Sequence, residues 1–112
     1  YLSGGEAAAD VQRTLLALTV ESIAQAIETV PLTSVHICGG GADNTFLMAR
    51  LAERLRPADV TTTEAVGIPP SWVEAAAFAW LAAQTLAGSP GNVPAVTGAT
   101  AERVLGGIYR GR

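Results

Sequence analysis

The chain has 112 residues, 49% of them hydrophobic and 15% charged, which is enough for one compact domain with a buried core and excludes a disordered chain. Its net charge is −3 and its seven basic residues are scattered arginines, which argues against a nucleic-acid-binding protein. The single cysteine excludes an internal disulfide and a cysteine-rich zinc site, and the longest apolar run, 75–83, is far too short to span a membrane.

The first residues, "YLSGGEAAAD", show no basic-then-apolar signal pattern and do not begin with Met. This start indicates a fragment or a processed chain. With a single cysteine and no signal pattern, the expected location is a reducing cytoplasm.

An amphipathic helix is predicted over Asp10–Val30, because apolar residues recur at spacings of three and four on one stripe. Asp10 is expected to cap its first turn, and Pro31 to end it. The stripe consists of Leu16, Val20, Ile23, Ile27 and Val30, and it is widened by Leu15 and Leu18.

Residues 34–63 predict a strand–helix–strand unit. The β-branched run "SVHIC" (34–38) is typical of a buried parallel strand, a helix is predicted over 44–56, and "ADVTTT" (58–63) is a second strand. A right-handed crossover would place the two strands side by side in one parallel sheet. On the helix we expect Leu47, Met48, Leu51, Ala52 and Leu55 to face inward and Arg50, Glu53 and Arg54 outward.

The remainder predicts a loop at 64–70, a helix from Ser71 to Ala87 ended by Gly88, an ordered loop at 88–100, and a short strand or docked tail at 103–109. The helix is apolar almost all round, so we expect other elements to sandwich it. Because two strands cannot cover such a helix, residues 1–112 are expected to form a single partial domain of a larger α/β protein, rich in helix and with a short parallel sheet.

The glycine run Gly39, Gly40 and Gly41 lies between the first predicted strand and the following helix. Glycines there permit a turn with positive φ and the close approach of a ligand, and a helix N-terminus suits a phosphate. Asn44 could cap that helix or bind a ligand. The spacing fits neither the dinucleotide nor the P-loop fingerprint, so nucleotide binding and a simple tight turn are both open.

Four other residues and one short segment could carry chemistry. Glu74 completes a Ser71-x-x-Glu74 capping box, the favoured interpretation of this carboxylate. His36 is expected to be a packed, hydrogen-bonded residue and Cys38 a buried small hydrophobe. Trp72 is expected in the core, with sugar stacking as the alternative. "TGA" at 97–99 could be a plain turn or line a nucleotide cleft.

Five motifs together resemble one known family. "DVQRTLLALTVESIAQAI", "CGGGADNTFLMARL", "EAAAFAWLA", "NVPAVTGA" and "VLGGIY" stand in the order and spacing of the C-terminal part of anhydro-N-acetylmuramic acid kinases, which are sugar kinases of the actin-like superfamily. The resemblance covers residues 10–109. It implies the C-terminal portion of an actin-like ATPase (ribonuclease H-like) domain, and it assigns Gly39, Gly40, Gly41 and Asn44 to adenosine binding.

The resemblance also implies a reaction. ATP and Mg²⁺ would phosphorylate the 6-oxygen of the anhydro-amino sugar while its 1,6-anhydro ring is hydrolysed, as a step of peptidoglycan recycling in the bacterial cytoplasm. Glu74 would lie at the sugar site. The family's phosphate loop and its aspartate general base belong to an N-terminal part missing here, which would also hold most of the Mg²⁺, so the isolated chain should not catalyse.

The family further suggests a homodimer, and exposed apolar surface predicts either self-association or cover by that N-terminal part. Two alternatives remain: a non-catalytic nucleotide-binding module, and a structural or partner-docking α/β domain.

Overall fold

The computed structural model describes residues 4–109 and 111. The chain forms two compact units, Tyr1–Ser71 and Trp72–Arg112, and each is described by itself. No described helix is both long enough and apolar enough to cross a membrane.

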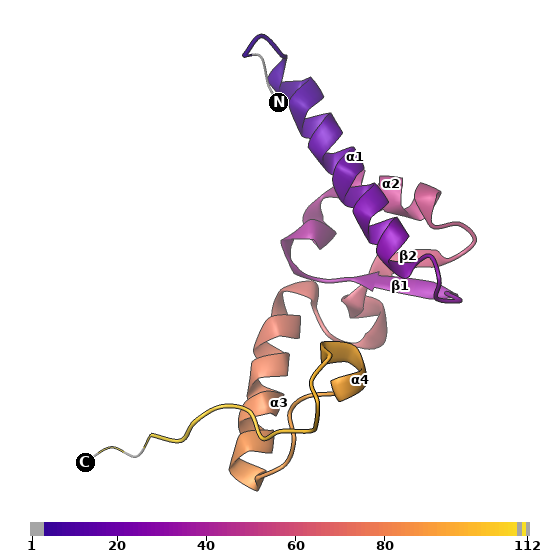
Figure 1. Ribbon diagram of the computed structural model, residues 1–112. Helices are drawn as coiled ribbons and strands as arrows, with labels where there is room; N and C mark the ends of the chain where they lie inside the picture. The colour runs from indigo at the N-terminus through magenta and orange to yellow at the C-terminus, as the bar shows by residue number, and fades with distance from the viewer. Residues whose placement is uncertain (1–3, 110, 112) are drawn as a thin grey trace. The chain divides into compact units, whose positions relative to one another are not determined.

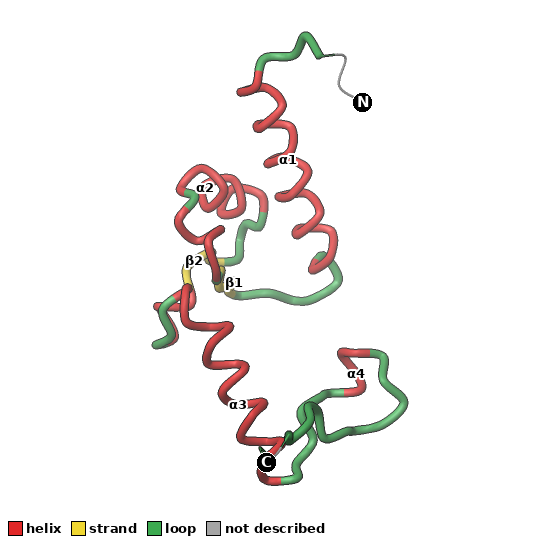
Figure 2. The backbone as a smooth tube through the Cα atoms, turned by 90° about the vertical axis from the view of Figure 1, so that its left-hand side faces the viewer, coloured by secondary structure: helices red, strands yellow, loops and turns green. Residues whose placement is uncertain are grey.

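The first unit is the predicted strand–helix–strand arrangement with one preceding helix (Figure 1). Strands β1 and β2 are parallel and hydrogen-bonded, with Ser34 opposite Asp59 and Ile37 opposite Thr62. Helices α1 and α2 lie on the same side of this pair (Figure 2). The predicted parallel pairing is therefore confirmed. The elements are α1 (Ala8–Ile27), β1 (Ser34–Ile37), the 3₁₀ turn η1 (Gly39–Asp43), α2 (Thr45–Arg54), β2 (Asp59–Thr62) and the 3₁₀ turn η2 (Thr63–Val66).

Helix α1 begins earlier and ends earlier than the pattern predicts. Its N-cap is Ala7, which makes no side-chain cap hydrogen bond, so the expectation that Asp10 caps the helix is wrong. The alanines before Asp10 are strong helix formers and extend the helix toward the N-terminus, which leaves Asp10 in the first turn, where its charge favours the helix dipole. At the other end, Val30 precedes Pro31 and lies outside the helix, because a residue before proline disfavours the helical conformation.

The small core of this unit lies between α1 and α2. Val20 and Ala24 of α1 and Leu51 of α2 are buried, and Leu51 is 0% exposed. Leu15 and Leu18 are 57% and 62% exposed, so the predicted widening of the α1 stripe is wrong. The inward residues of α2 are as predicted, since all five are buried or half-buried while Arg50, Glu53 and Arg54 are exposed.

The sheet is less buried than predicted. Val35 and Ile37 of β1 are half-buried, whereas His36 is exposed and so is Cys38 directly after the strand. The expectations of a buried strand and a buried cysteine are therefore wrong. Among the described residues of this unit, helices pack on one face of the strand pair only, so the side chains on the other face stay exposed. His36 is hydrogen-bonded as expected, with its Nδ1 2.9 Å from the Thr61 hydroxyl.

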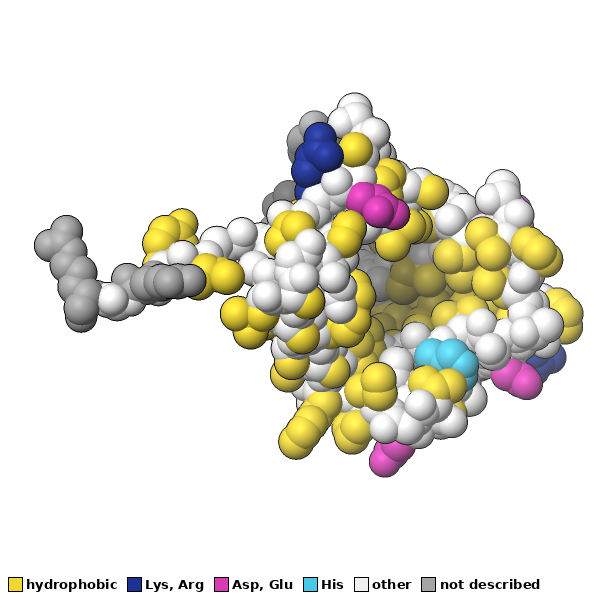
Figure 3. All heavy atoms as spheres, turned by 90° about the horizontal axis from the view of Figure 1, so that it is seen from below, with side chains coloured by type: hydrophobic (Ala, Val, Ile, Leu, Met, Phe, Trp, Pro, Cys, Tyr) yellow, Lys and Arg dark blue, Asp and Glu magenta, His cyan; other side chains and the backbone are white. Residues whose placement is uncertain are grey.

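The second unit consists of helix α3 (Val73–Ala87), the short helix α4 (Pro94–Thr97) and the segments around them. A 3₁₀ turn, η3 (Pro70–Trp72), leads into α3, which therefore starts after the predicted Ser71. Gly88, with φ +66°, ends α3 as predicted. The expected sandwich is not formed by the described residues, because Phe78, Trp80 and Leu86 are 64%, 54% and 76% exposed. In Figure 3 apolar side chains form several separate patches among the white atoms of the surface.

The segment after α3 is held by specific hydrogen bonds. The Asn92 side chain donates to the Ala101 carbonyl at 3.1 Å and accepts from the Arg103 N–H at 2.6 Å. The Thr85 hydroxyl donates to the Leu105 carbonyl, so residues 103–105 are docked and 103–109 is not a strand, while Tyr109 is 96% exposed. Within this segment Gly98, with φ +71°, is the C-cap of α4, so "TGA" at 97–99 runs from the last helical residue, Thr97, to just past the end of that helix.

Candidate functional site

The glycine run lies at the carboxyl end of β1, the edge at which open parallel sheets commonly bind ligands. Residues Gly39–Asp43 form the 3₁₀ turn η1, and α2 begins at Thr45, one residue after the predicted start at 44. A positive φ occurs at Gly39 (+68°) and not at Gly40 or Gly41. The turn therefore requires glycine conformationally at one of the three positions.

Gly40 is the informative glycine. A Cβ atom at this position would meet nothing within 4 Å, and its φ is one that any residue adopts. At Gly41 a Cβ would lie 3.5 Å from the Leu47 side chain, an ordinary contact. The fold of this unit thus places no demand for glycine at position 40. A bare backbone there leaves the turn open to close approach by a ligand.

Asn44 caps α2, which confirms one of the two roles predicted for it. Its Oδ1 accepts a hydrogen bond of 3.0 Å from the Leu47 N–H, which satisfies one of the unpaired donors of the helix N-terminus. Because the oxygen is used by the cap, the amide NH₂ group is the part of the side chain left to donate to a ligand. The cap and a ligand contact are therefore compatible in one side chain.

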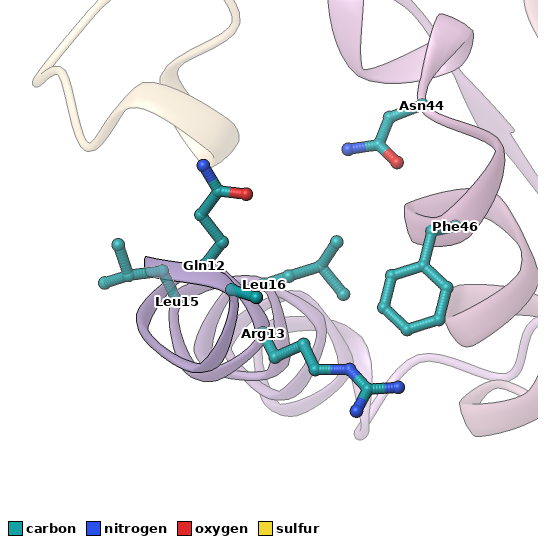
Figure 4. A pocket seen from close by; sticks show the side chains of 7 residues that line it. Gln12, Arg13, Leu15, Leu16, Asn44 and Phe46 are labelled. Atoms are coloured by element: carbon teal, nitrogen blue, oxygen red, sulfur yellow. The ribbon is translucent and has the colours of Figure 1, made fainter. Parts of the chain in front are cut away.

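A groove of about 640 Å³ adjoins this turn, between the N-terminal half of α1 and the start of α2 (Figure 4). Within it the guanidinium of Arg13 lies 6.0 Å from the centre of the Phe46 ring, a cation–π contact that orients the ring. The groove is lined by Ala9, Gln12, Arg13, Leu15, Leu16, Asn44 and Phe46.

Apart from Asn44, these lining residues were not predicted as site residues. The sequence contains one weak indication that Phe46 belongs to the site. It is a large aromatic residue two positions after Asn44, and it is not part of the inward-facing set of α2. Gln12 and Arg13 offered none, since their position beside Asn44 results from the packing of α1 on α2. Contacts between elements distant in sequence leave no local pattern to read.

Glu74 does not form the predicted capping box. The residue that precedes α3 is Trp72, no side chain caps this helix, and Ser71 belongs to the preceding 3₁₀ turn. The favoured cap interpretation is therefore wrong, because the 3₁₀ turn runs straight into the helix and leaves no extended capping residue. Glu74 is exposed in the first turn of α3, in the second unit, and Trp72 is 67% exposed, so Trp72 is not the core residue that was expected.

The chemistry available from these residues is that of a binding site. The turn η1 offers bare backbone, Asn44 an amide donor, and the groove an apolar wall with polar side chains beside it. Asp10, Asp43 and Asp59 are all exposed. In the described part of the chain, no group of three or more His, Cys, Asp or Glu side chains could hold a metal ion.

Comparison with known proteins shows the same family over nearly the whole chain. The family model for anhydro-N-acetylmuramic acid kinase matches residues 2–111. The chain is 51% identical over 110 residues to the anhydro-N-acetylmuramic acid kinase of Nitrosomonas europaea, covering 96% of this chain and 30% of that protein. It is 54% identical over 103 residues to that of Cupriavidus pinatubonensis, covering 90% and 28%. The chain thus spans less than a third of the length of these relatives.

Proposed function

Since the chain belongs to the anhydro-N-acetylmuramic acid kinase family, we propose that it is the C-terminal, nucleotide-binding part of such a kinase, within an actin-like ATPase fold. In the proposed reaction, water hydrolyses the 1,6-anhydro bridge of anhydro-N-acetylmuramic acid. The freed 6-oxygen then takes the γ-phosphoryl group of ATP, and ADP leaves. The step would serve peptidoglycan recycling in the bacterial cytoplasm.

The observation that carries the nucleotide assignment is the open backbone at Gly40. Position 40 has room for a side chain and an ordinary φ, as Gly5 also has. Unlike Gly5, Gly40 lies in the turn at the carboxyl end of a parallel strand, where a ligand commonly approaches. We assign Gly39, Gly40, Gly41 and the Asn44 amide to the adenosine part of ATP. Residues upstream of this segment in the full-length protein would bind the phosphates and Mg²⁺ and supply the general base.

Asn44→Asp separates capping from nucleotide binding. Aspartate caps helices about as well as asparagine, so thermal stability should stay within about 0.5 kcal/mol of the wild type. Because the variant carries an acceptor where the amide donor was, ATP affinity in the full-length protein should fall about tenfold, the value of one lost hydrogen bond to a buried partner. Calorimetric titration with ATP and thermal melting measure the two effects. Unchanged affinity with unchanged stability would restrict Asn44 to capping.

Glu74 is proposed to act at the sugar site, where a carboxylate could assist ring opening or orient the attacking water. Glu74 caps nothing in α3, but its charge lies in the first turn of that helix. Glu74→Gln should therefore cost only about 0.3–1 kcal/mol of stability, through the helix dipole, while lowering kcat. The matched control is Glu102→Gln, an exposed carboxylate of the same unit, which should change neither quantity. Equal kcat in the wild type and Glu74→Gln would remove this residue from the reaction.

The whole proposal is tested by assaying two proteins with anhydro-N-acetylmuramic acid, ATP and Mg²⁺. The full-length protein should release ADP and 6-phosphorylated sugar in equal amounts. The 112-residue chain should release neither, because the proposed general base and phosphate loop lie upstream. Turnover by the short chain would show that the base has been misplaced, and inactivity of the full-length protein would contradict the kinase assignment. We also propose that the full-length protein is a homodimer.

A further inference from the structure

We propose that the groove between α1 and α2 holds the base of ATP and that Gln12 recognises the edge of that base. This inference rests on the proposed function and extends it from the glycine turn to a specificity-determining residue on another element. The link is Asn44, which follows the glycine turn directly and also lines the groove. A nucleoside bound at the turn therefore has this groove beside it.

The apolar part of the groove suits a flat aromatic ring. Leu16 is half-buried and Phe46 is 45% exposed, so both present apolar surface to a ligand. The Arg13 guanidinium, 6.0 Å from the centre of the Phe46 ring, helps to hold that ring in place. A volume of about 640 Å³ lies within the usual range of small-molecule sites, about 300–1,000 Å³.

The polar part of the groove suits the edge of a base. The side chains of Gln12 and Asn44 point toward one another from α1 and from the turn before α2 (Figure 4). The Asn44 oxygen is occupied by the Leu47 N–H, so Asn44 presents its NH₂ group. The Gln12 amide carries a donor and an acceptor side by side, which match a ring nitrogen and the 6-amino group of adenine.

The same two amides argue against the other plausible occupant, an apolar segment from elsewhere in a longer protein. Such a segment would remove Gln12 and Asn44 from water without offering hydrogen-bond partners, and an unpaired buried amide is costly. A purine covers Leu16 and Phe46 with its faces and satisfies the amides with its edge. The groove therefore favours a base over a packed side chain.

The test is the nucleotide preference of Gln12→Glu in the full-length protein, measured by calorimetric titration with ATP and GTP. A carboxylate only accepts hydrogen bonds: it would repel the N1 lone pair of adenine and could accept from both N1–H and N2–H₂ of guanine. ATP affinity should fall about tenfold and the ratio of ATP to GTP affinity by more, since one bidentate pair discriminates between bases on this scale. Gln12→Ala should lose ATP affinity without gaining GTP affinity.

Gln25→Glu is the matched control, because Gln25 lies on the same helix, is exposed and does not line the groove. Its nucleotide preference should equal that of the wild type. If the wild type binds ATP and Gln12→Glu keeps the same preference, the inference is overturned while the proposed function stands. If the wild type binds no nucleotide, both fall. A crystal structure of the ATP complex with the base away from Leu16 and Phe46 would also overturn the inference.

Discussion

Gly40→Val is expected to reduce the ATP affinity of the full-length protein about 10- to 100-fold, because forcing extra side-chain atoms into occupied space typically costs about 1–3 kcal/mol. The valine side chain would occupy the open space above the turn, where the ligand is proposed to approach. Within the chain this side chain would meet no atom within 4 Å of its Cβ, and φ at position 40 is unstrained. Calorimetric titration with ATP should therefore show the loss while the melting temperature changes little.

Two other glycines serve as controls for this experiment. Gly5 also has open space around it and no positive φ, so Gly5→Val should change neither affinity nor stability. Gly39 has φ +68°, so Gly39→Val should lower the melting temperature through backbone strain. If Gly40→Val kept wild-type affinity, the glycine run would be only a turn, and the docking-domain alternative would gain support.

Leu51→Ala is expected to cost about 2–5 kcal/mol of unfolding free energy, the usual range for a fully buried leucine. Leu51 is 0% exposed and lies in α2, where α1 packs against it. The described core contains few other buried side chains, so this loss is large compared with the total stability of a small domain, about 5–15 kcal/mol. Urea denaturation followed by circular dichroism measures the change.

Leu18→Ala is the matched control, because it removes the same atoms from a helix position that is 62% exposed. It should change the unfolding free energy by about 0.5 kcal/mol or less. Equal effects of the two substitutions would mean that α1 and α2 do not pack as described. The same pair of variants would also test the groove indirectly, since its two walls are these helices.

The exposed apolar face of α3 is a surface that we expect to be covered in a longer protein. A helix that is apolar almost all round is stable in water only when other elements cover it, yet Phe78, Trp80 and Leu86 are largely exposed here. The chain covers 30% of its Nitrosomonas europaea relative. We infer that the remaining part of the full-length protein, or a second copy, covers this face.

The amino-acid sequence by itself determined the local features of this protein. The strand–helix–strand unit, the parallel pairing and the inward face of α2 follow from periodicity, and the Asn44 cap and the Gly88 helix end follow from residue type. The helix ends and the inward face depend on interactions within a few residues, which a single sequence displays directly. The parallel pairing joins residues 25 apart, and it follows from the short right-handed crossover between the two strands. The five ordered motifs also identified the family, because their joint order is specific even though each motif alone is weak.

The tertiary structure alone decided which distant residues meet and which surfaces are covered. Packing of α1 on α2 placed Gln12 and Arg13 beside Asn44 and left Leu15 and Leu18 exposed. It also left His36 and Cys38 on an uncovered side of the strand pair, and the continuous 3₁₀ turn before α3 removed the expected Glu74 cap. Burial and contact between elements depend on how whole helices and strands pack. A local sequence pattern shows which residues one element offers for packing, but it does not show which residues of another element they meet.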